Sequence, residues 1–360
     1  MKQSVMMSAA LVCALALTGC SNDEVLERNQ SRAIGFAAMT NNSTRSTDPQ
    51  GNDLTDFNEI TTANLSFFRV YGYFRDHGTS NVPTQILSSE AVNKVNNVWT
   101  YENTRYWAPS NDYYFMAFTT NTQGERPWHY TFPETNVEDA LAAFQANHGC
   151  GTLTLDYSDN ATEACRYDLV YSYAYRETDA AITDVTAVPF TFDHLLARVR
   201  FKFTNSMDDA NSTISIENLK ISGTPVAGSI TFAASNSYTG VKWTANTAKG
   251  NVDVAFGTGN LTDFAISRTR NSQCRYLIPV TQALTVTFDV TWKINGTVYG
   301  KYTKTANIAS QEYLKGTSYQ FNAEINEESL LGNDSKPITF TVTTVNGWPS
   351  WGDGSDLTLQ

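Results

Sequence analysis

Short runs of alternating apolar and polar residues recur along most of the chain, and this period of two restricts the fold more than any other property. Tyr113, Phe115 and Ala117 share one face of such a run, and Leu153 and Leu155 share a face of another. Alternation with this period is typical of half-buried β-strands. Because turn-forming residues separate many short runs, the pattern predicts antiparallel β-sandwiches rather than a helical fold.

The dipeptide Asn295-Gly296 is the clearest hairpin turn, because both residues tolerate positive φ and strand-like runs flank them. One helix is predicted at Val137 to Ala146, a segment with acids in its first turn. Charged residues make up only 17% of the 360 residues while tyrosine and phenylalanine are frequent, which favours strands. The length is enough for two domains. The sequence therefore predicts an all-β fold with two β-sandwich domains and one short helix.

The segment after Val188 changes its pattern at its centre. Its inward-facing positions have even numbers up to His194 and odd numbers beyond Leu196. A one-residue slip at Leu195-Leu196 reconciles the two halves, and a β-bulge is the structure that produces such a slip. On this interpretation Arg198 and Arg200 point to water, and His194 is a packed core histidine.

The first 19 residues have the features of a secretory signal peptide. Lys2 supplies a positive start, Met6 to Leu17 is almost wholly apolar, and small residues follow. This apolar stretch is too short to span a bilayer as a helix, which needs roughly 20 residues. The four residues that end at Cys20 resemble the bacterial lipobox, in which the cysteine is acylated and becomes the mature N-terminus. The acidic residues that follow resemble the surface-export signal of Bacteroidetes lipoproteins.

The charge and the motifs exclude several classes of function. A formal net charge of -11 repels phosphate backbones, so we expect no nucleic-acid binding. The four histidines show no metal-ligand spacing, and no nucleotide-binding or nucleophile motif is present. The sequence therefore predicts a protein that is not an enzyme, with no catalytic residue, no cofactor and no metal.

Three cysteines lie in the body of the chain, at Cys150, Cys165 and Cys274. Export beyond the cytoplasm permits disulfides, and a bridge from Cys150 to Cys165 would close a short loop worth about 3 kcal/mol. Three isolated buried thiols explain the odd number equally well. The sequence leaves both possibilities open.

Several phrases together resemble the fimbrillins of Bacteroidetes, a family of lipoprotein pilins and related surface proteins. They extend over nearly the whole chain after the leader, and their order combined with the lipobox is more specific than any one of them. The phrases are Ala33-Ile34-Gly35-Phe36 with Thr44-Arg45; Tyr106-Trp107-Ala108-Pro109 with Tyr114-Phe115-Met116-Ala117; Phe192 to Val199; Leu277-Ile278-Pro279; Leu314 to Tyr319; and Ile338-Thr339-Phe340 with Trp348.

The resemblance implies two transthyretin-like Greek-key sandwiches, lipidation at Cys20 and export to the outer membrane surface. It also implies cleavage after an arginine by a trypsin-like protease, and Arg45 matches the family position because it follows the first strand. Cleavage in such pilins removes that strand and opens a groove for a strand of a neighbouring subunit. The expected partners are other pilin subunits, lipoprotein-processing enzymes, the arginine-specific protease and, through the lipid, the outer membrane.

Two segments share a pattern that suits such an exchange. The expected first strand places Ile34, Phe36 and Ala38 at alternate positions, and a later segment places Ile338, Phe340 and Val342 in the same way. A strand of the second kind could fill the pockets left by the first. The same segment is also compatible with an ordinary core strand of its own subunit.

The sequence thus predicts a structural pilin subunit that serves adhesion in surface fimbriae. An alternative is a surface lipoprotein that binds glycans through an aromatic platform of tryptophan and tyrosine side chains on a β-sandwich. The expected organisation is a signal peptide (1–19), a lipidated tether with the removable first strand (20–45), an N-terminal sandwich (46–187), a C-terminal sandwich (188–348) and a tail (349–360).

Overall fold

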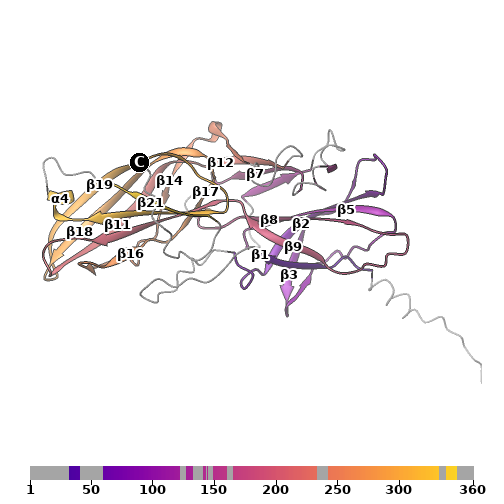
Figure 1. Cartoon of the computed structure of the whole chain (residues 1–360), viewed down its shortest axis with the longest axis horizontal. Helices are drawn as coiled ribbons and strands as arrows, with labels where there is room; N and C mark the ends of the chain where they lie inside the picture. The colour runs from indigo at the N-terminus through magenta and orange to yellow at the C-terminus, as the bar shows by residue number, and fades with distance from the viewer. Residues whose placement is uncertain are drawn as a thin grey trace, which may run out of the picture.

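The computed structural model describes residues 32–40, 60–121, 127–132, 141–142, 144, 149–159, 165–232, 242–331 and 338–346. Strands dominate these residues, and the molecule is elongated, with the N-terminal half at one end and the C-terminal half at the other (Figure 1). The predicted all-β sandwich fold is confirmed. Residues 141, 142 and 144 of the predicted helix are helical, whereas the short helix α4 (Glu327–Leu331) was not expected.

Two sheets contain all the described strands that precede residue 195. One has seven strands in the order β1 (Phe36–Thr40), β9 (Val188–His194), β8 (Val170–Glu177), β5 (Asn111–Thr119), β2 (Phe67–Asp76), β3 (Thr84–Val95) and β4 (Val98–Thr100). The other has four strands in the order β13 (Trp243–Ala245), β12 (Ala227–Phe232), β7 (Gly151–Asp156) and β6 (Trp128–Thr131).

Two further sheets form the sandwich at the C-terminal end. In the first, the order is β16 (Thr269–Asn271), β10 (Ala197–Asn205), β20 (Thr317–Ile325) and β21 (Thr341–Asn346), and β17 (Arg275–Leu277) also pairs with β10. In the second, the order is β14 (Asn251–Ala255), β11 (Ser212–Pro225), β18 (Thr281–Ile294) and β19 (Thr297–Glu312), and β15 (Phe264–Ala265) also pairs with β11.

The strand β5 shows how the period of two produces the core. Tyr113, Phe115 and Ala117 belong to a hydrophobic cluster on one face of the seven-stranded sheet. The residues between them, Tyr114 and Met116, belong to a larger cluster on the opposite face. All nine residues of β5 are therefore buried, because both faces of this sheet are covered.

The hairpin predicted at Asn295-Gly296 joins β18 to β19. Both residues adopt positive φ, at 50° for Asn295 and 76° for Gly296. This is the backbone conformation that a two-residue turn needs to match the twist of the flanking strands. The local turn chemistry therefore sets the register of the longest hairpin in the described residues.

The β-bulge expected at Leu195-Leu196 is wrong. These residues separate β9 from β10, and the two strands belong to different sheets, so the change of parity marks a crossing between sheets. Arg198 and Arg200 are also buried rather than exposed, because β10 lies between β16 and β20. Their Nε atoms donate to the neighbouring strand β20, at 2.9 and 2.8 Å.

His194 is buried, as predicted, but it has a partner that the sequence did not indicate. Its Nδ1 lies 2.7 Å from Oδ2 of Asp168, and both side chains are shielded from water. The pair sits where the chain passes from the first sheet to the C-terminal sandwich.

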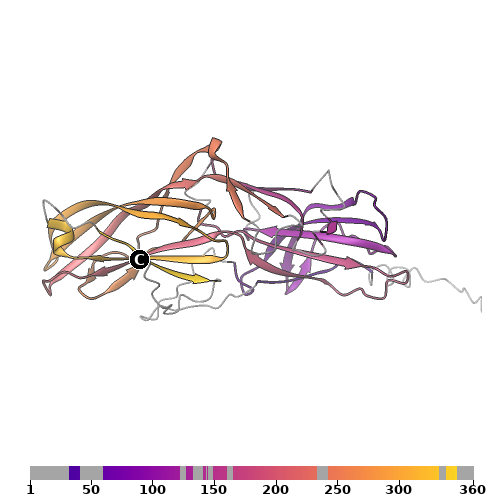
Figure 2. The same cartoon turned by 45° about the horizontal axis from the view of Figure 1, so that its top comes forward.

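Strands from the two halves of the chain meet in the four-stranded sheet. β12 pairs with β7 over six residue pairs, from Ala227 opposite Asp156 to Phe232 opposite Gly151. In Figures 1 and 2 this sheet lies over the middle of the molecule. The larger hydrophobic cluster is continuous across it. The division of the chain near residue 188 stays a prediction, and the assignment of strands to sheets changes at residues 195–196.

Candidate functional site at the first strand

The strand β1 is the end strand of the seven-stranded sheet and pairs with one neighbour, β9. The pairing is parallel, with Phe36 opposite Val188 and Thr40 opposite Phe192. The other ladders of this sheet that the structure describes are antiparallel. Because β1 is terminal, its loss would leave every other ladder of the sheet intact and would expose the edge of β9.

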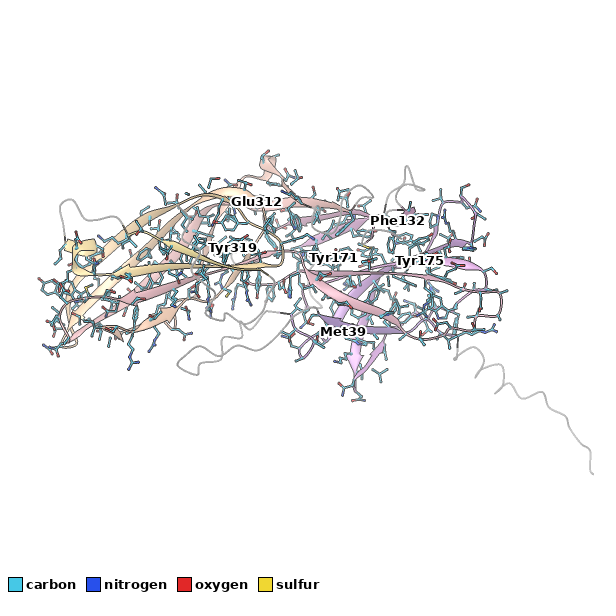
Figure 3. The ribbon with its side chains drawn as sticks, viewed as in Figure 1. Met39, Phe132, Tyr171, Tyr175, Glu312 and Tyr319 are labelled. Carbon is cyan, nitrogen blue, oxygen red and sulfur yellow. The ribbon has the colours of Figure 1, made fainter. Side chains whose placement is uncertain are left out.

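Side chains of the first strand alternate between the core and the outside. Ile34 is 1% exposed and Phe36 is 5% exposed, and Ala38 packs half-buried against the same cluster. Ala37 and Met39 face outwards, and Figure 3 shows Met39 on the outer side of the strand. The first strand is therefore an integral part of the hydrophobic core rather than a strap lying over it.

Phe36 lies at the centre of an aromatic group drawn from several strands. Its ring stacks on Phe190 at 5.6 Å and meets the edge of Phe115 at 6.0 Å. It also contacts Tyr101 at 5.4 Å and Phe68 at 6.1 Å. Burial of a phenylalanine is worth about 1.5–3 kcal/mol, and each aromatic pair adds about 0.5–1.5 kcal/mol. Removal of the strand would leave an apolar pocket lined by these four rings.

The segment from Tyr101 to Trp107 holds the other side of the first strand. The backbone N–H of Ile34 donates to the carbonyl of Arg105 at 2.8 Å, and that of Trp107 donates to Arg32 at 2.9 Å. The hydroxyl of Tyr101 donates to the carbonyl of Ile34 at 2.8 Å. Burial raises the pKa of the Tyr101 phenol, so it stays protonated and remains a donor at neutral pH.

A pair of threonines secures the C-terminal end of β1. The backbone N–H of Thr40 donates to Oγ1 of Thr62 at 2.9 Å, and the two hydroxyl oxygens lie 3.1 Å apart. The residues that follow Thr40, including the predicted cleavage site Arg45, lie outside the described residues, and so does Cys20. Both assignments stay predictions.

Gly35 occupies a position where a side chain has room on the face opposite to that of Ile34 and Phe36. A Cβ built on Gly35 would lie 3.8 Å from Cβ of Ala187, which is ordinary van der Waals contact. The corresponding position in the proposed incoming strand is Thr339. The groove around β1 therefore has space for the Cβ that such a strand would bring.

The possible donor segment is packed in the C-terminal sandwich of its own chain. Ile338 is buried, and Phe340 and Val342 are half-buried against the larger hydrophobic cluster. The ring of Phe340 lies 5.4 Å from that of Phe201. β21 is the end strand of its sheet and pairs antiparallel with β20. In this structure the segment thus fills a place in its own subunit, the arrangement that the sequence left open.

The three body cysteines are buried, and none of the three forms a disulfide. Burial raises the pKa of the Cys150 and Cys165 thiols to about 12, so both are protonated at neutral pH. These two thiols act as small apolar core side chains, and the structure contains no bridge between them.

The tryptophans required for an aromatic platform are largely inside the protein. Trp107, Trp128, Trp243 and Trp292 are each at most 6% exposed. Trp348 lies outside the described residues. The buried indoles cannot stack on a sugar, so this part of the structure does not support the glycan-binding alternative.

Several residues that hold the first strand were not predicted from the sequence. Tyr101, Thr62 and Arg105 contact residues 34–40 from segments distant in the chain, and the local pattern of each is ordinary for a strand or loop. Tyr101 lies five residues before Tyr106, where one of the fimbrillin-like phrases begins, and this closeness is the sequence signal that points to it.

The fold and the site define an elongated double β-sandwich protein whose first strand is a terminal strand seated in the core. Residues 44–348 match the family described as fimbrillin-like. The chain therefore belongs to the fimbrillin-like family, and the resemblance seen in the sequence is confirmed.

Three solved structures are similar to this chain. A fimbrial protein from Bacteroides vulgatus superimposes with a TM-score of 0.53 at 15% identity, over 88% of this chain and 99% of that chain. At this identity the likeness shows the fold alone. A proposed cell adhesion protein from Bacteroides uniformis gives a TM-score of 0.46 at 14% identity, over 87% of this chain and 97% of that chain. Another proposed cell adhesion protein, from Bacteroides ovatus, gives a TM-score of 0.44 at 13% identity, over 88% of this chain and 96% of that chain. A search of curated proteins finds no match.

Membership of the fimbrillin-like family supports a pilin or adhesion role at the cell surface. Within the described residues, no helix combines the length and the apolar character needed to cross a bilayer.

Proposed function

We propose that the chain is a non-enzymatic structural pilin subunit of surface fimbriae, assembled with other subunits by strand exchange and serving adhesion. It is exported as an outer membrane lipoprotein acylated at Cys20, and a trypsin-like protease then cleaves after Arg45. Cleavage separates β1 from the rest of the chain, and a strand of another subunit takes its place.

The observation that carries this proposal is the position of β1. The strand is terminal in its sheet, yet Ile34 and Phe36 fill an apolar pocket. An empty pocket beside an unpaired sheet edge favours the addition of any suitable strand, because both apolar burial and backbone hydrogen bonds are regained. A polymer then forms because each subunit repairs the edge of the next.

The spacing of the inward residues also supports exchange with a segment like residues 338–342. Its inward residues Ile338, Phe340 and Val342 repeat the spacing of the inward residues of the first strand. The space at Gly35 admits the Cβ of Thr339. A donor must leave its own sandwich, where Phe340 packs on Phe201, so the incoming contacts have to replace those contacts.

Cleavage is tested with the substitution Arg45→Ala, with Arg28→Ala as the matched control. We expect Arg45→Ala to abolish polymers on a gel and by electron microscopy, because β1 stays covalently attached. Arg28→Ala should polymerise normally, and its filaments should begin at Ser46. Ladders of normal length from Arg45→Ala would disprove the role of this cleavage.

Lipidation is tested separately with Cys20→Ala. Labelled palmitate should enter the wild-type protein and not the variant, and the variant should be lost from the outer membrane fraction. Equal labelling of both proteins would contradict acylation at Cys20.

A further inference from the structure

Three side chains with metal-binding chemistry meet at one end of the seven-stranded sheet. His77 follows β2, Asp112 lies in β5 and Glu177 ends β8, and these three strands are neighbours in the seven-stranded sheet. Asp112 lies opposite Arg75 on one side and opposite Glu177 on the other. His77 lies in the turn that follows β2, and its ring reaches both Asp112 and Glu177.

The possible ligand atoms of these residues are close together. Nδ1 of His77 lies 2.9 Å from Oδ1 of Asp112, and Nε2 lies 3.4 Å from Oε1 of Glu177. One ligand atom from each residue can be chosen so that all lie within 4.8 Å of one another. Tetrahedral coordination with bonds of about 2.1 Å places ligand atoms about 3.4 Å apart. Small side-chain rotations therefore bring all three atoms around a single ion.

The three residues differ in exposure in a way that suits a metal site. The side chain of Asp112 is 3% exposed, and its Oδ1 accepts a hydrogen bond from the hydroxyl of Tyr175 at 2.8 Å. Figure 3 shows Tyr175 farther towards the outer end of the molecule than Tyr171 on the same strand. A hydrogen-bonded carboxylate is the usual fixed ligand of a metal site. The side chains of His77 and Glu177 are 50% and 53% exposed, so they are free to close on an ion.

We propose that His77, Asp112 and Glu177 bind a divalent transition-metal ion, with Zn²⁺ as the representative. One imidazole and two carboxylates suit zinc better than calcium or magnesium, which prefer oxygen ligands alone. The exposed side of the site leaves the fourth position to water. The ion would join the ends of three neighbouring strands at one pole of the subunit.

One nearby group limits the affinity. Nε of Arg75 lies 3.8 Å from Oδ2 of Asp112, so its positive charge opposes a bound cation, and an ion at Oδ1 has to compete with the hydrogen bond from the Tyr175 hydroxyl. We therefore expect binding that is weaker than in structural zinc sites with four protein ligands.

The test is a zinc titration measured by calorimetry. It uses the purified chain without its leader, as the wild type and as three variants. His77→Gln and Glu177→Gln each remove one ligand from a half-exposed position, so the fold should survive, as circular dichroism can check. His129→Gln is the matched control, because His129 is exposed on β6, outside this group. The wild type and His129→Gln should bind one zinc ion with equal affinity. Each ligand variant should bind at least 10-fold more weakly.

Two results would overturn the proposal. The first is the absence of saturable zinc binding by the folded wild-type chain. The second is binding that Glu177→Gln and His77→Gln leave unchanged, which would place the ion elsewhere. Neither result bears on strand exchange, because β1 and its pocket contain none of these residues.

Discussion

Truncation of Phe36 to alanine tests whether the first strand is held by its aromatic contacts. The ring is 5% exposed and meets four other aromatic rings, at centroid distances from 5.4 to 6.1 Å. Phenylalanine-to-alanine changes at such positions cost about 3–5 kcal/mol, because a cavity remains where the ring was. Met39→Ala is the matched control, because Met39 lies on the same strand and is 53% exposed. We expect Met39→Ala to change the stability by about 0.5 kcal/mol or less.

The assay has two parts. Urea unfolding followed by tryptophan fluorescence reports the loss of stability, since Trp99 and Trp107 lie in or against the same cluster. Digestion by an arginine-specific protease, followed by size exclusion and mass spectrometry, then reports how long the cut strand stays bound. If the whole cost appears in dissociation, Phe36→Ala should release the strand about 100-fold to a few thousand-fold faster than Met39→Ala. Equal stability and equal release for the two variants would refute the assignment of β1 as a core strand.

Three further changes test the surroundings of the strand and the core. Gly35→Ala should stabilise the protein by about 0.4–1 kcal/mol in urea unfolding, because the methyl group would meet only Ala187, at 3.8 Å, and the unfolded chain loses freedom; a loss of stability would contradict that space. Tyr101→Phe should cost about 1 kcal/mol through the lost bond to Ile34, whereas the exposed Tyr106→Phe should cost almost nothing. Burial lowers the pKa of Lys315 to about 8, so its charge penalises folding fully below pH 8 and the penalty disappears as the pH rises towards 10.5. Lys315→Met should therefore be more stable than the wild type at pH 7, by up to about 3 kcal/mol, and this difference should shrink by pH 10; a gap independent of pH would refute the burial of the charge.

Much of the fold follows from local pattern. The period of two places Tyr113, Phe115 and Ala117 on one face, and the turn chemistry of Asn295-Gly296 produces the hairpin. The same reasoning failed at Leu195-Leu196, because a change of parity is compatible with either a bulge or a crossing between sheets. Only the partners of β9 and β10 distinguish the two, and those partners are distant in the sequence.

Prediction of the candidate site at the first strand has the same limit, because contacts between distant segments are not visible in local pattern. Alternation correctly indicates which side chains of the first strand face inwards, because Ile34 and Phe36 are buried and Met39 is exposed. The parallel pairing with β9 and the hydrogen bond from Tyr101 depend on long-range topology. The grouping of His77 with Asp112 was also beyond a search for local motifs, since 35 residues separate them.

The ladder between β7 and β12 has a mechanical consequence for a filament. Its strands derive from opposite halves of the chain and are paired over six residues, with core side chains of both halves beneath them. Tension along the long axis must therefore shear several backbone hydrogen bonds at once before the two halves can separate or hinge. The subunit should transmit pulling force as one stiff rod, and compliance in a fimbria should reside at the joints between subunits.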